Sequence, residues 1–218
     1  MTSNCRTIIC AVASAAILLA LLPARAHADP CDTEIPKAQR LLEQGVDVNA
    51  HDEFHRTSLH YAAFCGKTGL AALLIEKGAD VGARDEGRNT PLHMAACGSV
   101  GHTEVAALLI QKGADVNALD DSRSTPLHIA AGGDDIKLVA LLIQKGADVN
   151  ARDKDQRTPL HETALLGGGN MEVAALLIQK GADVNARDKE QDTPAMLAEM
   201  NGYAELAAML RKAPDKKK

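Results

Sequence analysis

Large aromatic side chains are scarce in this sequence. Its 218 residues include two Tyr, two Phe and no Trp. A compact α/β enzyme of this length normally needs more large rings to fill its centre, so the scarcity favours a thin fold built from layers of alanine and leucine. Hydrophobic residues make up 46% and charged residues 24%, which excludes a generally disordered chain.

Clusters of positively charged residues are also scarce. The net charge is −5, and the only basic run is formed by the last three lysines. Nucleic-acid-binding proteins carry clustered lysine and arginine, so we expect no nucleic-acid partner. The acidic balance instead favours a protein partner with a basic patch.

The first 28 residues have the three parts of a secretory signal peptide. Arg6 precedes an uncharged apolar run over 8–22, and the segment ends on Ala-x-Ala at Ala28. The run is too short for a membrane span, which needs about 20 apolar residues. We therefore expect cleavage between Ala28 and Asp29, with an uncleaved anchor as the alternative. The segment resembles bacterial signals, so the expected location is the periplasm, with no membrane span left after cleavage.

Two short motifs recur through the rest of the chain. The first reads Thr-Pro-Leu-His or a close variant and begins at Thr57, Thr90, Thr125, Thr158 and Thr193, in steps of 33, 35, 33 and 35 residues. The second reads Gly-x-Asp and begins at Gly45, Gly78, Gly113, Gly146 and Gly181. Two interleaved markers that keep their register over five copies indicate an internal repeat.

Each repeat predicts a pair of short helices. Thr followed by Pro is typical of a helix N-cap with Pro at the first helical position. The Leu-His-x-Ala-Ala segment predicts a first helix with small residues for close packing, and an apolar run such as 105–110 predicts a second helix. A Lys-Gly pair such as Lys112-Gly113 predicts its end, because glycine adopts the left-handed conformation there. An extended hairpin then leads to the next Thr-Pro.

This pattern resembles the ankyrin repeat, whose motif T-P-L-H-x-A recurs every 33 residues. The resemblance implies an all-α repeat solenoid of helix-turn-helix units joined by β-hairpins or loops, over residues 32–213. We divide it into a partial repeat (32–53), four full repeats (54–86, 87–121, 122–154 and 155–189) and a C-terminal cap (190–213). Residues 214–218 form a basic tail.

The eight histidines do not predict a metal site or an active site. His60, His93, His128 and His161 occupy one position of the repeat, so they lie about 8–10 Å apart and cannot share a zinc ion. The resemblance implies that this histidine bonds to backbone of the neighbouring repeat. The His161-Glu162 pair lacks the second histidine of H-E-x-x-H. We expect no catalytic residues, no metal and no cofactor.

The resemblance implies protein recognition through the hairpin tips and the concave face of the first helices. The candidate contact residues are Phe54, Arg56, Phe64, Glu86, Asn89, Asp121, Ser122, Lys154, Asp155, Arg157 and Leu166. Three of the four aromatic residues, Phe54, Tyr61 and Phe64, lie in one repeat, which favours a binding centre around Phe54, Arg56 and Phe64. Alternatively, Tyr61 and Phe64 cover the N-terminal edge of the stack. We expect the tip residues to be replaceable without loss of the fold.

Three cysteines remain after signal cleavage, and an oxidising compartment favours their pairing. By repeat register, Cys31 precedes the second helix of the partial repeat, and Cys65 ends the next first helix. We expect a Cys31–Cys65 disulfide, with Cys65–Cys97 as the alternative.

The leading hypothesis for function is a monomeric, non-enzymatic protein-binding scaffold of the periplasm. A narrower alternative is an immunity protein that neutralises a toxin acting in that compartment. The competing class is an envelope protein that depends on a thiol or a metal.

Overall fold

A computed structural model describes residues 31, 36, 45, 47–97, 102–166 and 168–213 of the chain. The predicted signal peptide with its cleavage site at Ala28 and Asp29, most of the partial repeat 32–53, the loop 98–101 and the basic tail 214–218 lie outside these residues.

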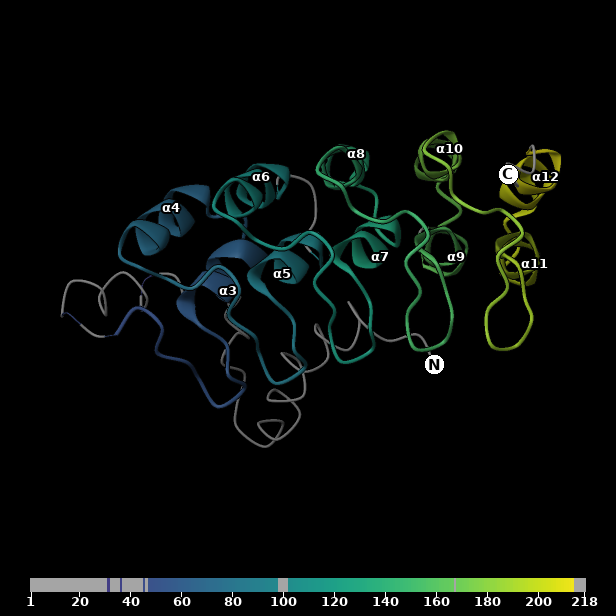
Figure 1. The fold of residues 1–218 in the computed structure, drawn as a ribbon. Coiled ribbons are helices and arrows are strands. Elements are labelled where there is room, and N and C mark those ends of the chain that lie inside the picture. Colours follow the sequence, from purple (N-terminus) through teal and green to yellow (C-terminus); the bar gives the residue numbers. More distant parts are fainter. Residues whose placement is uncertain are drawn as a thin grey trace, which may run out of the picture.

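Helices in this part of the chain form five pairs. They are α3 (Ser58–Phe64) with α4 (Thr68–Glu76), α5 (Pro91–Cys97) with α6 (Thr103–Gln111), α7 (Pro126–Ala131) with α8 (Ile136–Gln144), α9 (Pro159–Leu165) with α10 (Met171–Gln179), and α11 (Pro194–Met200) with α12 (Ala204–Lys212). The first helices form one row and the second helices another, while long loops project from the first-helix side (Figure 1). The predicted all-α repeat solenoid is confirmed, and the loops within the described ranges carry only an isolated bridge between His51 and Thr57.

The Thr-Pro motif starts the first helices as predicted. Thr125 has extended backbone and its Oγ1 accepts a hydrogen bond from the backbone N–H of His128. In return, the His128 ring Nδ1 accepts the backbone N–H of Thr125 at 3.1 Å. The same reciprocal cap occurs at Thr57 and Thr158, so three of the helix starts are held by residues of a single motif.

The second helices end at the predicted glycine. Gly113 has φ of 96°, a conformation that side chains with a Cβ rarely adopt. Its N–H donates to the carbonyl of Ile110 at 3.1 Å, and the next N–H, of Ala114, donates to Leu109 at 2.9 Å. These bonds satisfy carbonyls at the helix end and turn the chain toward the following loop.

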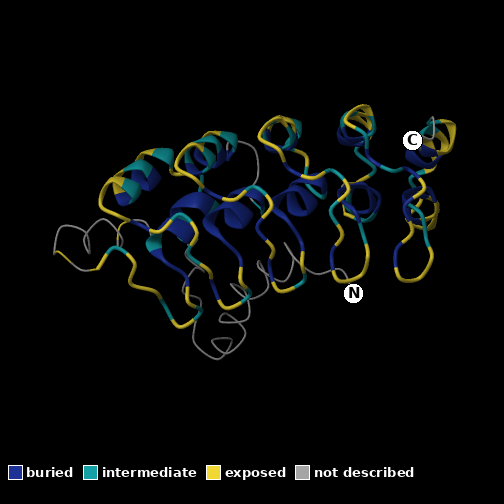
Figure 2. Cartoon of the chain, viewed as in Figure 1, coloured by how far each residue is buried: buried dark blue, intermediate teal, exposed yellow. Residues whose placement is uncertain are grey.

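The core is a continuous layer between the two rows of helices (Figure 2). Leucines at equivalent positions have no exposed surface; in the first helices these are Leu59, Leu92, Leu127 and Leu160, and in the second helices Leu74, Leu109, Leu142 and Leu177. Buried alanines fill the space between neighbouring first helices. Because every repeat places leucine and alanine in the same layer, the core needs few aromatic rings.

The repeated histidines join each repeat to the next. Since Nδ1 accepts the backbone N–H of the capping threonine, Nε2 carries the proton and donates to a carbonyl one repeat further along. The Nε2–carbonyl distances are 3.1 Å (His60 to Asn89), 3.2 Å (His93 to Ser124), 3.1 Å (His128 to Arg157) and 3.3 Å (His161 to Asp192). Burial lowers the pKa of His93, His128 and His161 to about 4, so these rings are neutral and structural.

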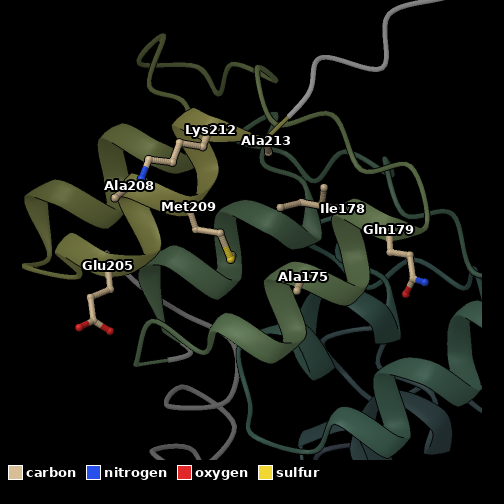
Figure 3. A pocket seen from close by; sticks show the side chains of 8 residues that line it. All are labelled: Ala175, Ile178, Gln179, Glu205, Ala208, Met209, Lys212 and Ala213. Carbon is tan, nitrogen blue, oxygen red and sulfur yellow. The ribbon is translucent and has the colours of Figure 1, made fainter.

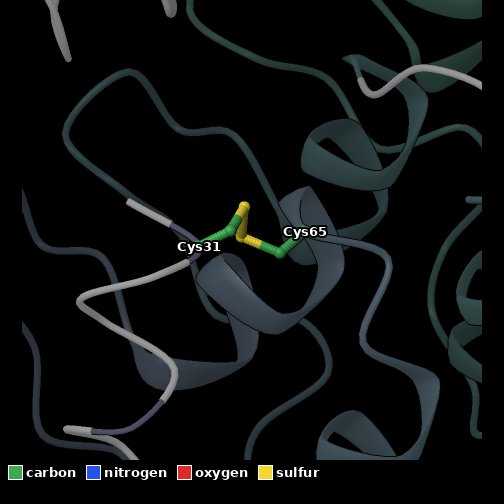
Figure 4. Close-up of a disulfide and its surroundings, with 2 residues drawn as sticks. All are labelled: Cys31 and Cys65. Atoms are coloured by element: carbon green, nitrogen blue, oxygen red, sulfur yellow. A yellow bond between two sulfur atoms is a disulfide. The ribbon is translucent and has the colours of Figure 1, made fainter. Parts of the chain in front are cut away.

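Cys31 and Cys65 form a disulfide, with their Cα atoms 5.5 Å apart (Figure 4). This is the pairing that the repeat register favours. Cys65 is the residue that follows the last turn of α3. The bond therefore links Cys31, ahead of the helix pairs, to the first helix of the described stack.

The last helix pair has a different outer surface. Glu199 of α11 stands where the preceding repeat has Ala164, which has no exposed surface, and Arg211 of α12 stands where it has the partly buried Ile178. Glu199 and Arg211 form an ion pair, with both side chains about half exposed. A polar outer face is what a terminal repeat requires, because no further repeat covers it.

Candidate functional site

The projecting loops are closed by a repeated aspartate. Its Oδ1 accepts the backbone N–H of the residue four positions later, at 2.7–2.9 Å in all five loops; the pairs are Asp52–Arg56, Asp85–Asn89, Asp120–Ser124, Asp153–Arg157 and Asp188–Asp192. Each aspartate thereby fixes the shape of its loop tip and turns the fourth residue back toward the stack.

Neighbouring tips are hydrogen-bonded to one another through their backbones. The bonds run from Glu86 N to Phe54 O (2.9 Å), Asp121 N to Gly87 O (2.9 Å), Lys154 N to Ser122 O (2.8 Å) and Lys189 N to Asp155 O (2.9 Å). We call this continuous row the tip edge; it comprises residues 53–55, 86–88, 121–123, 154–156 and 189–191. The tip edge holds its side chains at regular intervals on a connected backbone.

The structure separates the predicted contact residues into three groups. Exposed residues are Glu86, Asp121, Lys154, Asp155 and Leu166; partly buried residues are Phe54, Phe64, Ser122 and Arg157; buried residues are Arg56 and Asn89. All but Phe64 and Leu166 lie in or beside the tip edge. Nine of the eleven predicted contact residues therefore have exposed surface, and two are buried.

Arg56 and Asn89 are corrections to the predicted surface. Arg56 is 8% exposed, and its Nε lies 3.7 Å from Oδ2 of Asp85 in the next repeat. Asn89 is 7% exposed and donates its side-chain amide to both oxygens of Asp85, at 3.1 and 3.2 Å. Arg56 is thus not an exposed tip residue, and because its guanidinium lies between two repeats, we now expect its replacement to destabilise the stack.

Five exposed tip residues escaped the sequence prediction. They are His55, Arg88, Arg123, Gln156 and Gln191, which have φ between 57° and 68°. Each closes a tight turn; Arg88 N, for example, donates to Asp85 O at 2.8 Å. The available sequence signal was the recurring Asp, which is followed four residues later by a residue that turns inward. The turn was missed because its left-handed position carries no glycine.

The aromatic residues of the first described repeat take part in its packing. Tyr61 donates its hydroxyl to Asp52 Oδ2 at 2.6 Å, and burial together with this aspartate raises the pKa of Tyr61 to about 12. Phe64 is partly buried and packs against the core. Phe54 lies beneath the Arg56 guanidinium, 5.3 Å from its ring centroid. These contacts favour the alternative in which Tyr61 and Phe64 cover the edge of the stack.

A second row of side chains runs along the first helices, one residue after each repeated histidine and, in α11, after Met196 at the equivalent position. It comprises Tyr61, Met94, Ile129, Glu162 and Leu197, and we call it the inner row. Met94, Ile129 and Leu197 are 2%, 7% and 5% exposed. Glu162 is the one charged member, and burial, followed by the nearby Asp153, raises its pKa to about 7.

The comparison with known protein families agrees with this architecture. The family model for ankyrin repeats, which spans three copies, matches residues 27–120, 83–153, 102–188 and 127–218. The chain belongs to the ankyrin-repeat family. A search of curated proteins gives no match.

Ankyrin stacks are generally non-enzymatic scaffolds that bind other proteins. In this ankyrin stack, no three His, Cys, Asp or Glu side chains among the described residues are arranged to hold a metal ion. None of the described helices has the length and apolar character needed to cross a membrane.

The ankyrin stack also has an open groove on its second-helix side, between α10 and α12 (Figure 3). Its volume is about 800 Å³, and it is lined by Ala175, Ile178, Gln179, Glu205, Ala208, Met209, Lys212 and Ala213. Its lining comes from α10, α12 and the residue that follows α12. It is separate from both the tip edge and the inner row.

Proposed function

We propose that the chain, after export and signal cleavage, is a non-enzymatic protein-binding scaffold of the bacterial periplasm. It recognises its partner through the tip edge and the concave face of the first helices. The observation that carries this proposal is the backbone hydrogen bonding between neighbouring tips, at 2.8–2.9 Å in four successive junctions. A surface that is already ordered loses little conformational entropy when a partner binds.

The charges of the tip edge support a polar partner surface. Glu86 and Arg88 lie on one tip, and Asp121 and Arg123 on the next, all with exposed side chains. After removal of the signal peptide, the net charge becomes −7, since Arg6 and Arg25 are lost. This balance supports a partner with a basic patch, whose association is faster at low salt.

The proposal is tested by capture from periplasmic extract on immobilised mature chain with its disulfide intact. The tip variant E86A/D121A removes two exposed anions, and E104A/E172A removes the same charge from the starts of second helices. The Arg88–Asp121 pair is 60% and 57% exposed, so its loss has little effect on the fold. We expect the tip variant to lose the partner and the helix-start variant to retain it, with unchanged circular dichroism.

Equal capture by the two variants would overturn the assignment of the tip edge. If the captured protein is a toxin that the chain inhibits, the scaffold is an immunity protein. Export is tested separately by the intact mass of protein purified from the periplasmic fraction. We expect a chain that begins at Asp29, and a mass that includes residues 1–28 would contradict cleavage.

A further inference from the structure

Asp52 and Asp153 hold the same place in two different loops, but only one of them has all its acceptors filled. Oδ1 of Asp52 accepts the N–H groups of Phe54 and Arg56, and Oδ2 accepts the Tyr61 hydroxyl at 2.6 Å. Oδ1 of Asp153 likewise accepts the N–H groups of Asp155 and Arg157, both at 2.8 Å. Its Oδ2 has no donor among the described residues.

The missing donor follows from the sequence of the inner row. Where the first described repeat has Tyr61, whose hydroxyl reaches the loop aspartate, this repeat has the acid Glu162 at the equivalent position. Glu162 forms no hydrogen bond or ion pair with any described residue, and Asp153 is only 7% exposed. Two carboxylates in a partly desolvated place repel each other, and each raises the free energy of the other's charged form.

Cations that lie nearby are already engaged. Arg157 places its Nε 3.6 Å from Oδ2 of Asp188 in the next repeat. Asp155, the other acid that acts on Glu162, is paired with Lys189 at 3.3 Å. The charged groups that act on Glu162 are Asp153, Asp155 and Arg157, and of these Asp153 has no ion-pair partner among the described residues.

Equivalent aspartates elsewhere in the stack bind a guanidinium. Oδ2 of Asp85 lies 3.7 Å from Arg56 Nε, and Oδ2 of Asp188 lies 3.6 Å from Arg157 Nε, each arginine coming from the preceding repeat. Before Asp153, the preceding repeat has Ser124 at this position. The chain thus supplies a cation to two of these aspartates and leaves Asp153 without one.

We propose that Glu162 and Asp153 form a receptor for one arginine or lysine side chain of the partner protein, between the fourth loop tip and α9. This inference rests on the proposed function, and it identifies the chemistry that the partner presents to the concave face. A planar guanidinium can donate to both carboxylates at once, which makes arginine the better fit.

Binding at this receptor depends on pH in a defined direction. Without a ligand, the pKa of Glu162 is raised to about 7, so the carboxyl is largely protonated below this value. A bound cation favours the charged form and lowers the pKa. Linkage then requires the cation to bind more tightly above about pH 7 than below it.

The test uses a peptide probe and does not require the natural partner. Acetyl-Ala-Arg-Ala-amide is titrated into the mature chain, labelled with ¹³C at glutamate carboxyls, and its neutral citrulline analogue serves as the control. We expect the arginine peptide to shift the Glu162 carboxyl resonance and to bind on the order of ten-fold more tightly at about pH 8.5 than at about pH 5.5. The citrulline peptide should cause no shift.

Variants locate the effect. E162I restores an apolar residue like Ile129 to the inner row and should abolish the pH dependence, whereas E172Q, which removes an exposed acid at the start of α10, should retain it. No perturbation of Glu162 by the arginine peptide, or equal binding of the citrulline peptide, would overturn the receptor.

The two proposals fail in different experiments. If a partner is captured through the tip edge but binds E162I as tightly as wild type, only the receptor is wrong. If the arginine peptide binds at Glu162 but tip variants retain every captured protein, the receptor stands and the tip edge is wrong.

Discussion

The two ends of the stack are closed by different means. At the N-terminal end, a Cys31–Cys65 disulfide ties the preceding segment to α3. At the C-terminal end, closure depends on surface composition, with the Glu199–Arg211 ion pair replacing an alanine and an isoleucine of the preceding repeat. A covalent bond holds Cys31 to the stack, whereas a polar face allows a complete helix pair to meet solvent.

Removing the disulfide should have the largest effect. The bond closes a loop with a sequence separation of 34 residues. The chain-entropy relation predicts that C31S/C65S lowers the free energy of unfolding by about 3–4 kcal/mol. Urea denaturation measures the change, and the wild type in reducing agent should approach the double variant. A loss below about 1 kcal/mol would show that the N-terminal end does not depend on the bond.

Changes at the repeated histidine position should affect stability differently in the interior of the stack and at its C-terminal end. His161 bonds to a carbonyl of the next repeat, whereas Met196 at the equivalent position of α11 has no ring nitrogen to make such a bond. H161M leaves the Asp192 carbonyl and the Thr158 N–H without their partner, so we expect a loss of about 1–3 kcal/mol. The reverse change, M196H, should alter the stability by less than about 0.5 kcal/mol. Equal changes in stability from H161M and M196H would contradict a stabilising role of the His161 hydrogen bonds.

The cost of H161M should also depend on pH. The pKa of His161 is lowered from 6.5 to about 4 in the folded chain, so the unfolded chain takes up its proton first as pH falls. The stability contributed by a neutral His161 is present above about pH 6.5 and is lost as pH falls toward 4. Between about pH 7.5 and about pH 5, the cost of H161M should therefore shrink by about 2 kcal/mol. A cost that is the same at both values would contradict the lowered pKa.

Changing the cap into an interior surface should alter association more than stability. E199A/R211I introduces the residues of the preceding repeat, beside Met196 and Met200, which are 41% and 73% exposed. We expect a concentration-dependent increase in mass by light scattering, because an apolar repeat face has become accessible. E104A/K112I makes the same change of charge in α6 and at its C-cap, and should leave the mass unchanged. If both variants associate, the increase in mass is due to the lost charge alone.

The smallest expected effect on stability concerns a row of asparagines along the loops, which we call the asparagine ladder. Asn49, Asn117 and Asn150 each donate to a glycine carbonyl of the next repeat, at 3.0–3.2 Å, and each accepts an aspartate N–H. Gly82 holds the equivalent position and lacks both bonds. Its N–H donates to Asp80 Oδ1 at 2.8 Å, as the asparagine N–H groups do with their own aspartates, so its backbone suits an asparagine.

G82N should therefore strengthen the junction near the N-terminal end. We expect it to raise the free energy of unfolding by about 1 kcal/mol more than G82A does, because only asparagine supplies the amide. Urea denaturation of the two variants makes the comparison. If G82A stabilises equally, the gain comes from the backbone of the unfolded chain and the ladder contributes nothing at this junction.

The sequence by itself determined the fold of this protein and the position of its surface. Thr-Pro caps, Lys-Gly helix ends and buried leucines recur at one period, and each acts over a few residues, so local physical chemistry was sufficient to place them. The structural role of the four repeated histidines followed from the same register, because residues at one position of successive repeats lie too far apart to share a metal ion.

Only the tertiary structure decided which side chains remain on that surface. Arg56 and Asn89 lie in loops that read as exposed, yet the Asp caps turn them toward Asp85 in the neighbouring repeat. The effect of Asp153 on Glu162 was equally hidden, since the two acids are nine residues apart in the sequence. Repetition specifies the backbone of every unit, whereas burial and charge depend on which particular residues two units bring together.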